Sequence, residues 1–376
     1  MATKRAKTTR LDDYIQMLWD AKGTDLLLTV GAPPLVRVDG QLQPLEGAAA
    51  LGGDDTEALV RQVVTSDQWE MFSHDRELDF SFDWEGLARM RGNVFLQRGA
   101  VTLALRMIPR EIPTFDDIGL PDVIRQFVDL PQGFILVTGP TGSGKSTTLA
   151  SIIDRINIDR RVHILTIEDP IEYVHDHKNS AVNQREVGSD SASFDQALRS
   201  ALREDPDVLL VGEMRDLESI QTALTIAETG HLVFATLHTN DTAQAIDRIV
   251  DIFPADRRTQ IQVQLSHVLS GVVYQRLIPR VEGGLVAAYE VLLGNSPARN
   301  LIREGKTKQL RNVITTHTNE GMRTLEMSLN ELMQDGTIDM DTALGVSMYP
   351  RELEAPRPMQ VAVGGEDLAV GKRRRR

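Results

Sequence analysis

The chain has 376 residues, 41% of them hydrophobic and 25% charged, so it is expected to fold and, at this length, to form two domains. The formal net charge of −13 argues against a surface that wraps nucleic acid, and the lack of cysteine excludes disulfides, zinc fingers and a thiol nucleophile. Neither a signal peptide nor a run of about 18 apolar residues is present, which predicts a cytosolic protein that meets membranes only through partners.

The N-terminal part predicts a small α+β domain over residues 1–112. Apolar residues at helical spacing indicate a helix over 11–20, and a second helix is expected near 55–66. Runs of aliphatic and β-branched residues between turn signals indicate strands at 26–30, 35–38, 77–83, 88–97 and 101–108. Two prolines in a short polar run mark 113–121 as a linker.

Over 122–349 the pattern changes to apolar strands that alternate with amphipathic helices, which is typical of a parallel sheet with crossover helices. The expected strands span 134–138, 163–167, 208–211 and 232–236. Helices are expected to start near 146, 193 and 217, and most of 256–346 is predicted to be helical. The proline-containing tail 350–376, which ends in five basic residues, is predicted to be disordered.

A phosphate-binding loop follows the predicted strand 134–138. Residues 139–146 match G-x-x-x-x-G-K-[ST] at each specified position, and a helix is predicted to follow. Glycines let backbone N–H groups approach phosphate oxygens, Lys145 can neutralise the β- and γ-phosphates, and the Ser146 hydroxyl can ligate Mg²⁺. We therefore predict an ATP site formed by Gly139, Pro140, Thr141, Gly142, Ser143, Gly144, Lys145, Ser146 and Thr147.

Acidic groups follow two of the predicted strands. Glu213 comes shortly after 208–211, and the group 168–172 comes directly after 163–167. Because open α/β sheets bind ligands at the carboxyl ends of their strands, both groups are candidates to hold magnesium and to act on the attacking water.

Histidines also flank a predicted strand. His238, with Thr236 and Thr239, closes the strand 232–236, where a polar side chain can sense the γ-phosphate, although a structural role fits His238 equally well. His231 lies at the start of that strand and is therefore expected at the opposite end of the sheet. The sequence His175-Asp176-His177 has the look of a metal site, but no third ligand is suggested, so we interpret it as a polar loop.

Five arginines crowd a short span of the N-terminal domain. They are Arg89, Arg91, Arg98, Arg106 and Arg110. Two interpretations are equally open at this point: a solvated cationic face, or arginines that complete the nucleotide site of a neighbouring subunit in a ring-forming ATPase.

Together these pieces resemble the retraction ATPases of type IV pili, the PilT group of the secretion ATPase superfamily, over residues 11 to about 345. Residues 164–172 resemble the Asp box of that family, 201–216 its atypical Walker B motif and 227–239 its His box. Residues 298–304 match a C-terminal motif associated with retraction.

The resemblance implies an α/β fold with a RecA-like P-loop ATPase core and a smaller, PAS-like N-terminal domain. It implies that Glu172 orients the attacking water, that Glu213 is the acid on the magnesium side, and that His231 and His238 are the His-box residues. Arg89, Arg91 and Arg106 would belong to the domain that covers a nucleotide. The implied assembly is a homo-hexamer that uses ATP and Mg²⁺ to disassemble pilin at the membrane-embedded pilus base, against a platform protein of the inner membrane.

Other functions compete with this one. Extension and secretion ATPases share the core but usually carry a longer N-terminal region and a four-cysteine zinc insertion, so the short, cysteine-free chain favours retraction. An accessory retraction paralogue of the PilU type fits the same motifs. An inert scaffold subunit would not need Lys145, Glu172 and Glu213, so the presence of all three disfavours that function. A RecA-like nucleic-acid translocase would need a basic pore, which the acidic composition disfavours.

Overall fold

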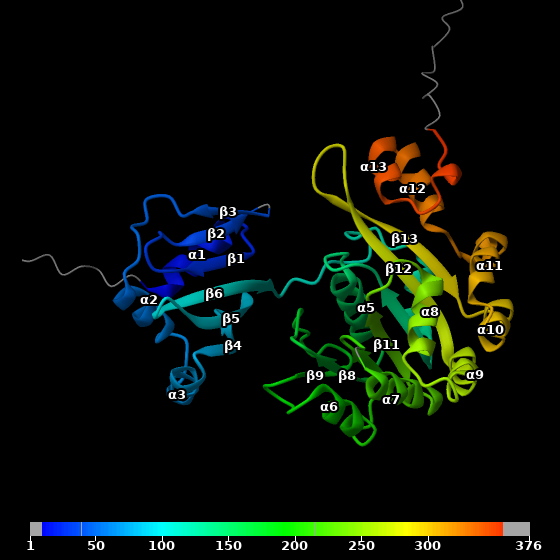
Figure 1. The fold of residues 1–376 in the computed structure, drawn as a ribbon, viewed down its shortest axis with the longest axis horizontal. Coiled ribbons are helices and arrows are strands. Elements are labelled where there is room, and N and C mark those ends of the chain that lie inside the picture. The colour runs from blue at the N-terminus through cyan, green and yellow to red at the C-terminus, as the bar shows by residue number, and fades with distance from the viewer. Residues whose placement is uncertain (1–9, 39, 215, 356–376) are drawn as a thin grey trace, which may run out of the picture. The chain divides into compact units, whose positions relative to one another are not determined.

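The structure is a computed structural model that describes residues 10–38, 40–214 and 216–355, with two β-sheets (Figure 1). Its contacts group the chain into two compact units. Of the described residues, one unit comprises those within 10–120, 125–134 and 146–236, and the other comprises those within 121–124, 135–145 and 237–355. Among the residues described, no helix is long and apolar enough to cross a membrane. The predicted division at 113–121 remains a prediction.

The first sheet is antiparallel, with six strands in the order β3-β2-β1-β6-β5-β4. The strands are β1 (Asp25–Leu28), β2 (Leu35–Val38), β3 (Gln41–Pro44), β4 (Glu77–Trp84), β5 (Ala88–Gln97) and β6 (Ala100–Pro109). The helices of this part are α1 (Leu11–Asp20), α2 (Gly53–Val60) and α3 (Ser66–Asp75). The predicted helix 11–20 is confirmed, and it buries the apolar face formed by Leu11, Tyr14, Ile15 and Leu18.

One prediction for this part was wrong in detail, and one strand was not predicted. The helix expected over 55–66 ends at Val60, and a separate helix, α3, begins at Ser66 because Thr65 caps it: its hydroxyl accepts from the backbone N–H of Gln68. Strand β3 was not predicted, since all four of its residues are exposed and no apolar alternation marks it.

The second sheet has seven strands in the order β13-β12-β7-β11-β10-β8-β9. The strands are β7 (Gly133–Thr138), β8 (His163–Glu168), β9 (Ala181–Glu186), β10 (Val208–Val211), β11 (Leu232–Leu237), β12 (Leu269–Pro279) and β13 (Leu285–Leu293). The intervening helices are α4 (Asp122–Arg125), α5 (Lys145–Asp159), α6 (Phe194–Ala201), α7 (Leu217–Glu228), α8 (Thr242–Asp251) and α9 (Arg258–Val268). β9, β8, β10 and β11 pair in parallel, and the residues of β7, β10 and β11 are all buried, as expected for strands covered on both faces.

The prediction that 256–346 is mostly helical was wrong for 269–293, the segment between α9 and α10. β12 and β13 form a long antiparallel hairpin whose register runs from Gly271 opposite Leu293 to Pro279 opposite Leu285. The run is rich in Val, Leu and Tyr and lies between helices, so its continuous apolar character could not separate a buried strand from a buried helix. The two glycines at 283–284 form the turn, both with positive φ.

The last part of the chain is helical. Its helices are α10 (Ser296–Arg303), α11 (Leu310–Thr316), α12 (Leu325–Gln334) and α13 (Met340–Val346). α12 and α13 pack on the β12–β13 hairpin through a core cluster of Tyr274, Ile278, Ala288, Leu325, Leu329, Met333, Ile338 and Ala343 (Figure 1). The predicted tail starts later than residue 350, because Pro350–Glu352 forms a 3₁₀ helix; the prediction of disorder for 356–376 lies outside the described residues.

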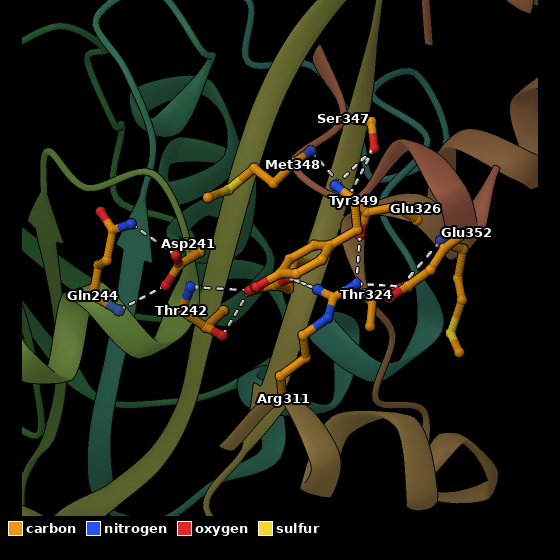
Figure 2. A network of polar contacts seen from close by, with 12 residues as sticks. Asp241, Thr242, Gln244, Arg311, Thr324, Glu326, Ser347, Met348, Tyr349 and Glu352 are labelled. Carbon is orange, nitrogen blue, oxygen red and sulfur yellow. Dashed lines mark hydrogen bonds and ion pairs between the residues drawn. The ribbon is translucent and has the colours of Figure 1, made fainter. Parts of the chain in front are cut away.

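Arg311 connects these helices to the chain that follows them (Figure 2). Its guanidinium pairs with Glu326 at 2.9 Å and with Glu352 at 2.6 Å, and the ring of Tyr349 stacks on it at 3.7 Å. Glu326 also accepts from the backbone N–H groups of Met348 (3.1 Å) and Tyr349 (3.0 Å). Burial raises the pKa of Glu326, but these hydrogen bonds outweigh it and hold that pKa below its ordinary value.

Glu290 lies nearest to the other terminal nitrogen of the same guanidinium, Nη1. It is buried, and its Oε1 accepts from the backbone N–H (3.0 Å) and hydroxyl (2.7 Å) of Thr242, while its Oε2 is 3.7 Å from Arg311. Burial raises the pKa of Glu290. These groups line a cavity of about 420 Å³ beside the first turn of α8.

Candidate nucleotide-binding site

The loop 139–144 connects β7 to α5, as predicted. Gly139, Gly142 and Gly144 all have positive φ, at 150°, 75° and 85°, conformations that side chains rarely adopt. Lys145 is only 8% exposed, and its Nζ donates to the carbonyls of Gly139 and Pro140, both at 3.0 Å. The backbone N–H groups at the start of α5 and the buried ammonium together form a site suited to the phosphates of a nucleotide.

The first turn of α5 also contacts the chain that follows β8. The hydroxyl of Thr147 lies 2.9 Å from that of Tyr173, and Ser146 beside it is half-buried. Tyr173 comes directly after Glu172, whose side chain is exposed. The structure therefore brings the neighbour of Glu172 to the start of the phosphate-loop helix.

The carboxyl ends of β8, β10 and β11 lie side by side. In the parallel register Val211 is opposite both Ile167 and Ala235, so Glu168, Gly212 and Thr236 come level at one edge. The N–H of Gly212 donates to Ile167 O at 2.8 Å, and the hydroxyl of Thr236 donates to Gly212 O. The prediction that the acidic groups meet at the carboxyl edge is thus confirmed in geometry, with Glu213 half-buried beside Gly212.

Glu168 is the buried member of the acidic group 168–172. Its carboxylate accepts from the hydroxyl of Thr166 (2.6 Å), the side-chain amide of Gln184 (3.1 Å) and the backbone N–H of Glu172 (3.4 Å). Burial raises the pKa of Glu168 despite these hydrogen bonds. Gln184 of β9 also donates to Tyr173 O at 2.8 Å and accepts from His175 N at 2.7 Å. Glu168 and Gln184 together fix the backbone on both sides of Glu172.

The two histidines of the 227–239 stretch lie at opposite ends of β11, as predicted. His231 Nδ1 is 2.9 Å from Ile226 O and 3.0 Å from the hydroxyl of Thr229, so it closes the C-terminal end of α7. His238 is exposed just beyond the strand. Next to it Thr239 lies 2.7 Å, hydroxyl to hydroxyl, from Thr138, the last residue before the phosphate loop.

The predicted arginines divide into two groups. Arg91 and Arg106 face each other across β5 and β6, and they line a groove of about 360 Å³ with Arg37, Asp25 and Asp79. Asp25 accepts from Arg106 at 2.8 Å, which offsets part of the repulsion between the cations. Arg89 instead donates to the hydroxyl of Ser81 at 2.7 Å and to Glu186 at 3.2 Å. The structure therefore gathers Arg91 and Arg106 but not Arg89.

His175 and His177 belong to the loop between β8 and β9, which is tied to β9 by hydrogen bonds. His177 Nδ1 accepts from the backbone N–H of Val182 at 3.0 Å, and burial lowers the pKa of His175 to about 4. Within the described residues, no three His, Asp or Glu side chains gather so as to hold a metal ion.

A buried strand, a glycine loop and a lysine at the start of the next helix define a P-loop nucleotide-binding protein. The model of the family described as "Type II/IV secretion system protein" matches residues 102–335. The type IV pilus retractation ATPase PilT of Pseudomonas aeruginosa is 48% identical over 87% of this chain and 95% of its own length. The type IV pilus ATPase PilU of the same organism is 39% identical over 95% and 93%.

A solved structure agrees with these relatives. The crystal structure of the pilus retraction motor PilT with bound ADP superposes with a TM-score of 0.86, at 48% identity, and covers 92% of this chain and 99% of that one. The chain belongs to the type II/IV secretion system protein family and, within it, to the PilT group of pilus retraction ATPases. The predicted α/β class with a RecA-like core beside a smaller N-terminal α+β part is confirmed.

Proposed function

We propose that this chain is the ATPase motor of type IV pilus retraction, which hydrolyses ATP at the loop 139–146 and uses the energy to draw pilin out of the fibre. One observation carries the catalytic part of the proposal: Lys145 is buried and held by the first two carbonyls of a three-glycine loop at the start of a helix. Its relatives support the cellular part, since they include a protein named for pilus retraction at 48% identity.

Each side chain at the phosphate loop has a role in binding the nucleotide. Lys145 neutralises the β- and γ-phosphates, while the loop N–H groups and Thr147 hold the phosphate chain. The Ser146 hydroxyl and the Glu213 carboxylate are oxygen donors of the kind that Mg²⁺ prefers, and a site with one carboxylate is usual because this ion keeps waters and phosphate oxygens as further ligands. When bound, Mg²⁺ neutralises charge on the phosphates.

The remaining groups act on the reaction itself. Glu172 orients the attacking water, and its backbone is held for this purpose by Glu168. His238, exposed beyond the end of β11, senses the γ-phosphate. Arg89, Arg91 and Arg106 reach the nucleotide of a neighbouring copy and stabilise the charge that develops during transfer.

The motor acts as an assembly of identical chains. Six copies form a ring in the cytoplasm, at the inner membrane, and the ring docks on the platform protein of the pilus base. Contact with the membrane runs through that partner, and no nucleic acid takes part. Binding to single-stranded DNA that weakens with salt would contradict this and favour a translocase.

Phosphate release by the purified chain tests the enzyme. We expect Mg²⁺-dependent release in the wild type, and nearly complete loss in both Lys145→Ala and Glu172→Gln. Lys145→Ala should also weaken ADP binding, whereas Glu172→Gln should keep it, because Glu172 is exposed and its proposed role is on the water rather than on the phosphates. Turnover that survives in Glu172→Gln would remove Glu172 from its role.

A second function, that of an accessory motor of the PilU type, is favoured by one observation: the relative named PilU matches 95% of this chain at 39% identity. Deletion of the gene separates the two. Cells that keep extended pili and cannot withdraw them identify the principal motor, whereas partial withdrawal identifies the accessory one. Loss of pili altogether would contradict both and point to an extension ATPase.

A further inference from the structure

Gln275 of β12 touches the phosphate loop from the side of the sheet. Its side chain is 2% exposed, and its Nε2 donates to the carbonyl of Ser143 at 2.8 Å. Ser143 is itself buried, so this amide supplies a hydrogen bond at a place that water does not reach. The contact joins residues 132 positions apart in the chain.

Two glycines of the phosphate loop lie too close to Gln275 for a side chain. A Cβ atom at Gly139 would lie 2.2 Å from the backbone carbonyl oxygen of Gln275. A Cβ atom at Gly144 would lie 2.8 Å from its side-chain Nε2. Gln275 therefore contacts both the first and the last glycine of the loop, its main chain against one and its side chain against the other.

The hydrogen bond to Ser143 fixes the direction of one loop N–H group. A trans peptide is planar, so the C=O of Ser143 and the N–H of Gly144 point in opposite directions. Because the carbonyl is held toward Gln275, the Gly144 N–H is aimed away from β12. Phosphate loops bind phosphate through such N–H groups, and rotation of this peptide would replace a donor with a carbonyl oxygen that repels the anion.

We propose that Gln275 is a positioning residue for phosphate binding, which acts through the Ser143–Gly144 peptide and does not touch the nucleotide. This rests on the proposed function, that the loop binds the phosphates of ADP and ATP. It adds a requirement that the loop sequence alone does not contain: a side-chain donor at position 275.

Two variants of similar volume test the requirement. Gln275→Met keeps the bulk but offers no donor, and Gln275→Glu places a carboxylate against the Ser143 carbonyl. Leaving a buried acceptor without its partner typically lowers the equilibrium constant for the state that needs the hydrogen bond by about 10- to 100-fold. We expect the ADP affinity of Gln275→Met, measured by calorimetry, to fall by about the same factor. Gln275→Glu should lose more, because it adds negative charge near the phosphates.

A matched control separates positioning from general damage to the fold. Gln264 on α9 is also a buried glutamine, at 8% exposed, and Gln264→Met should change ADP affinity by less than about twofold. A further readout is the turnover split: at saturating ATP, Gln275→Met should recover most of its kcat, since Gln275 acts on binding and not on the attacking water. If the role of Gln275 were merely structural, Gln275→Met and Gln264→Met would lower the melting temperature equally, and their ADP affinities would not differ.

The outcomes distinguish this inference from the proposed function. If wild type binds ADP, Lys145→Ala does not, and both folded Gln275 variants bind ADP within about twofold of wild type, the positioning role is wrong while the nucleotide site stands. If wild type itself fails to bind ADP, the proposed function is wrong. Should Gln275→Met not fold, Gln275→Glu decides, because it differs from the native residue by one terminal group.

Discussion

Replacing Arg311 with methionine should destabilise the C-terminal helices strongly. The change removes the cation that pairs with Glu326, which is 1% exposed, and that lies 3.7 Å from Glu290, which is 5% exposed. At an effective dielectric of about 20, Coulomb's law gives roughly 6 kcal/mol of attraction for charges 2.9 Å apart, before desolvation is subtracted. Removing one partner of a buried pair typically costs about 3–5 kcal/mol, and we expect about 4 kcal/mol here.

Two measurements read this effect at the right place. Urea unfolding followed by circular dichroism gives the free energy of unfolding of wild type and variant. The urea curve followed by tryptophan fluorescence should differ little between the two, because Trp19, Trp69 and Trp84 all lie in the N-terminal part. Hydrogen exchange at the amides of Met348 and Tyr349, which donate to Glu326, should lose protection.

Control variants make the reasoning refutable. Arg323→Met breaks an ion pair of similar length, 2.7 Å, but with a partner that is 57% exposed, so it should cost less than about 1 kcal/mol. In the double variant Arg311→Met with Glu326→Gln, removal of the buried charge should recover part of the loss. A cost below about 1 kcal/mol for Arg311→Met, or additive costs in the double variant, would refute the account.

Two further changes test the packing of the site. The pKa of His175 falls from 6.5 to about 4, so the folded chain binds fewer protons than the unfolded chain between these values; stability is full above pH 6.5 and should drop by about 3 kcal/mol as the pH falls to about 4. Urea titrations at several pH values should show that His175→Leu removes this slope, and an unchanged slope would assign it elsewhere. Gly139→Ala should abolish ADP binding, because its Cβ would meet a backbone oxygen at 2.2 Å, whereas Gly142→Ala, with open space around it, should cost only about 1–2 kcal/mol of left-handed strain. Equal melting temperatures and affinities for the two alanine variants would contradict the close approach of β12.

The sequence predicted the parts whose signal is local. The phosphate loop contains its own glycines and lysine, and β7, β8, β10 and β11 are short apolar runs that end where polar residues begin. The placement of Glu168 and Glu213 at one edge also followed, because parallel strands align their carboxyl ends.

What the sequence did not predict depends on partners far along the chain. Gln184 and Gln275 are ordinary polar residues within strands, and only the register of β9 and β12 brings them to Glu168 and to the phosphate loop. β9 itself went unrecognised, since its residues are largely polar and only two of the six are buried. The grouping of Arg91 and Arg106 apart from Arg89 was likewise a matter of cross-strand pairing rather than of spacing.

Strand β12, which the sequence did not predict, contacts both the phosphate loop and the C-terminal helices. Successive side chains of a β-strand point to opposite faces, so Tyr274 and Gln275 must serve different neighbours. Gln275 holds the phosphate loop, while Tyr274 is buried among Leu325, Leu329 and Met333 and lines the cavity that contains Arg311. A shift of β12 by one residue would exchange the two faces and break both sets of contacts at once. The nine-residue register with β13, fixed at its far end by the glycine turn, is therefore a condition for nucleotide binding as well as for the packing of α12 and α13.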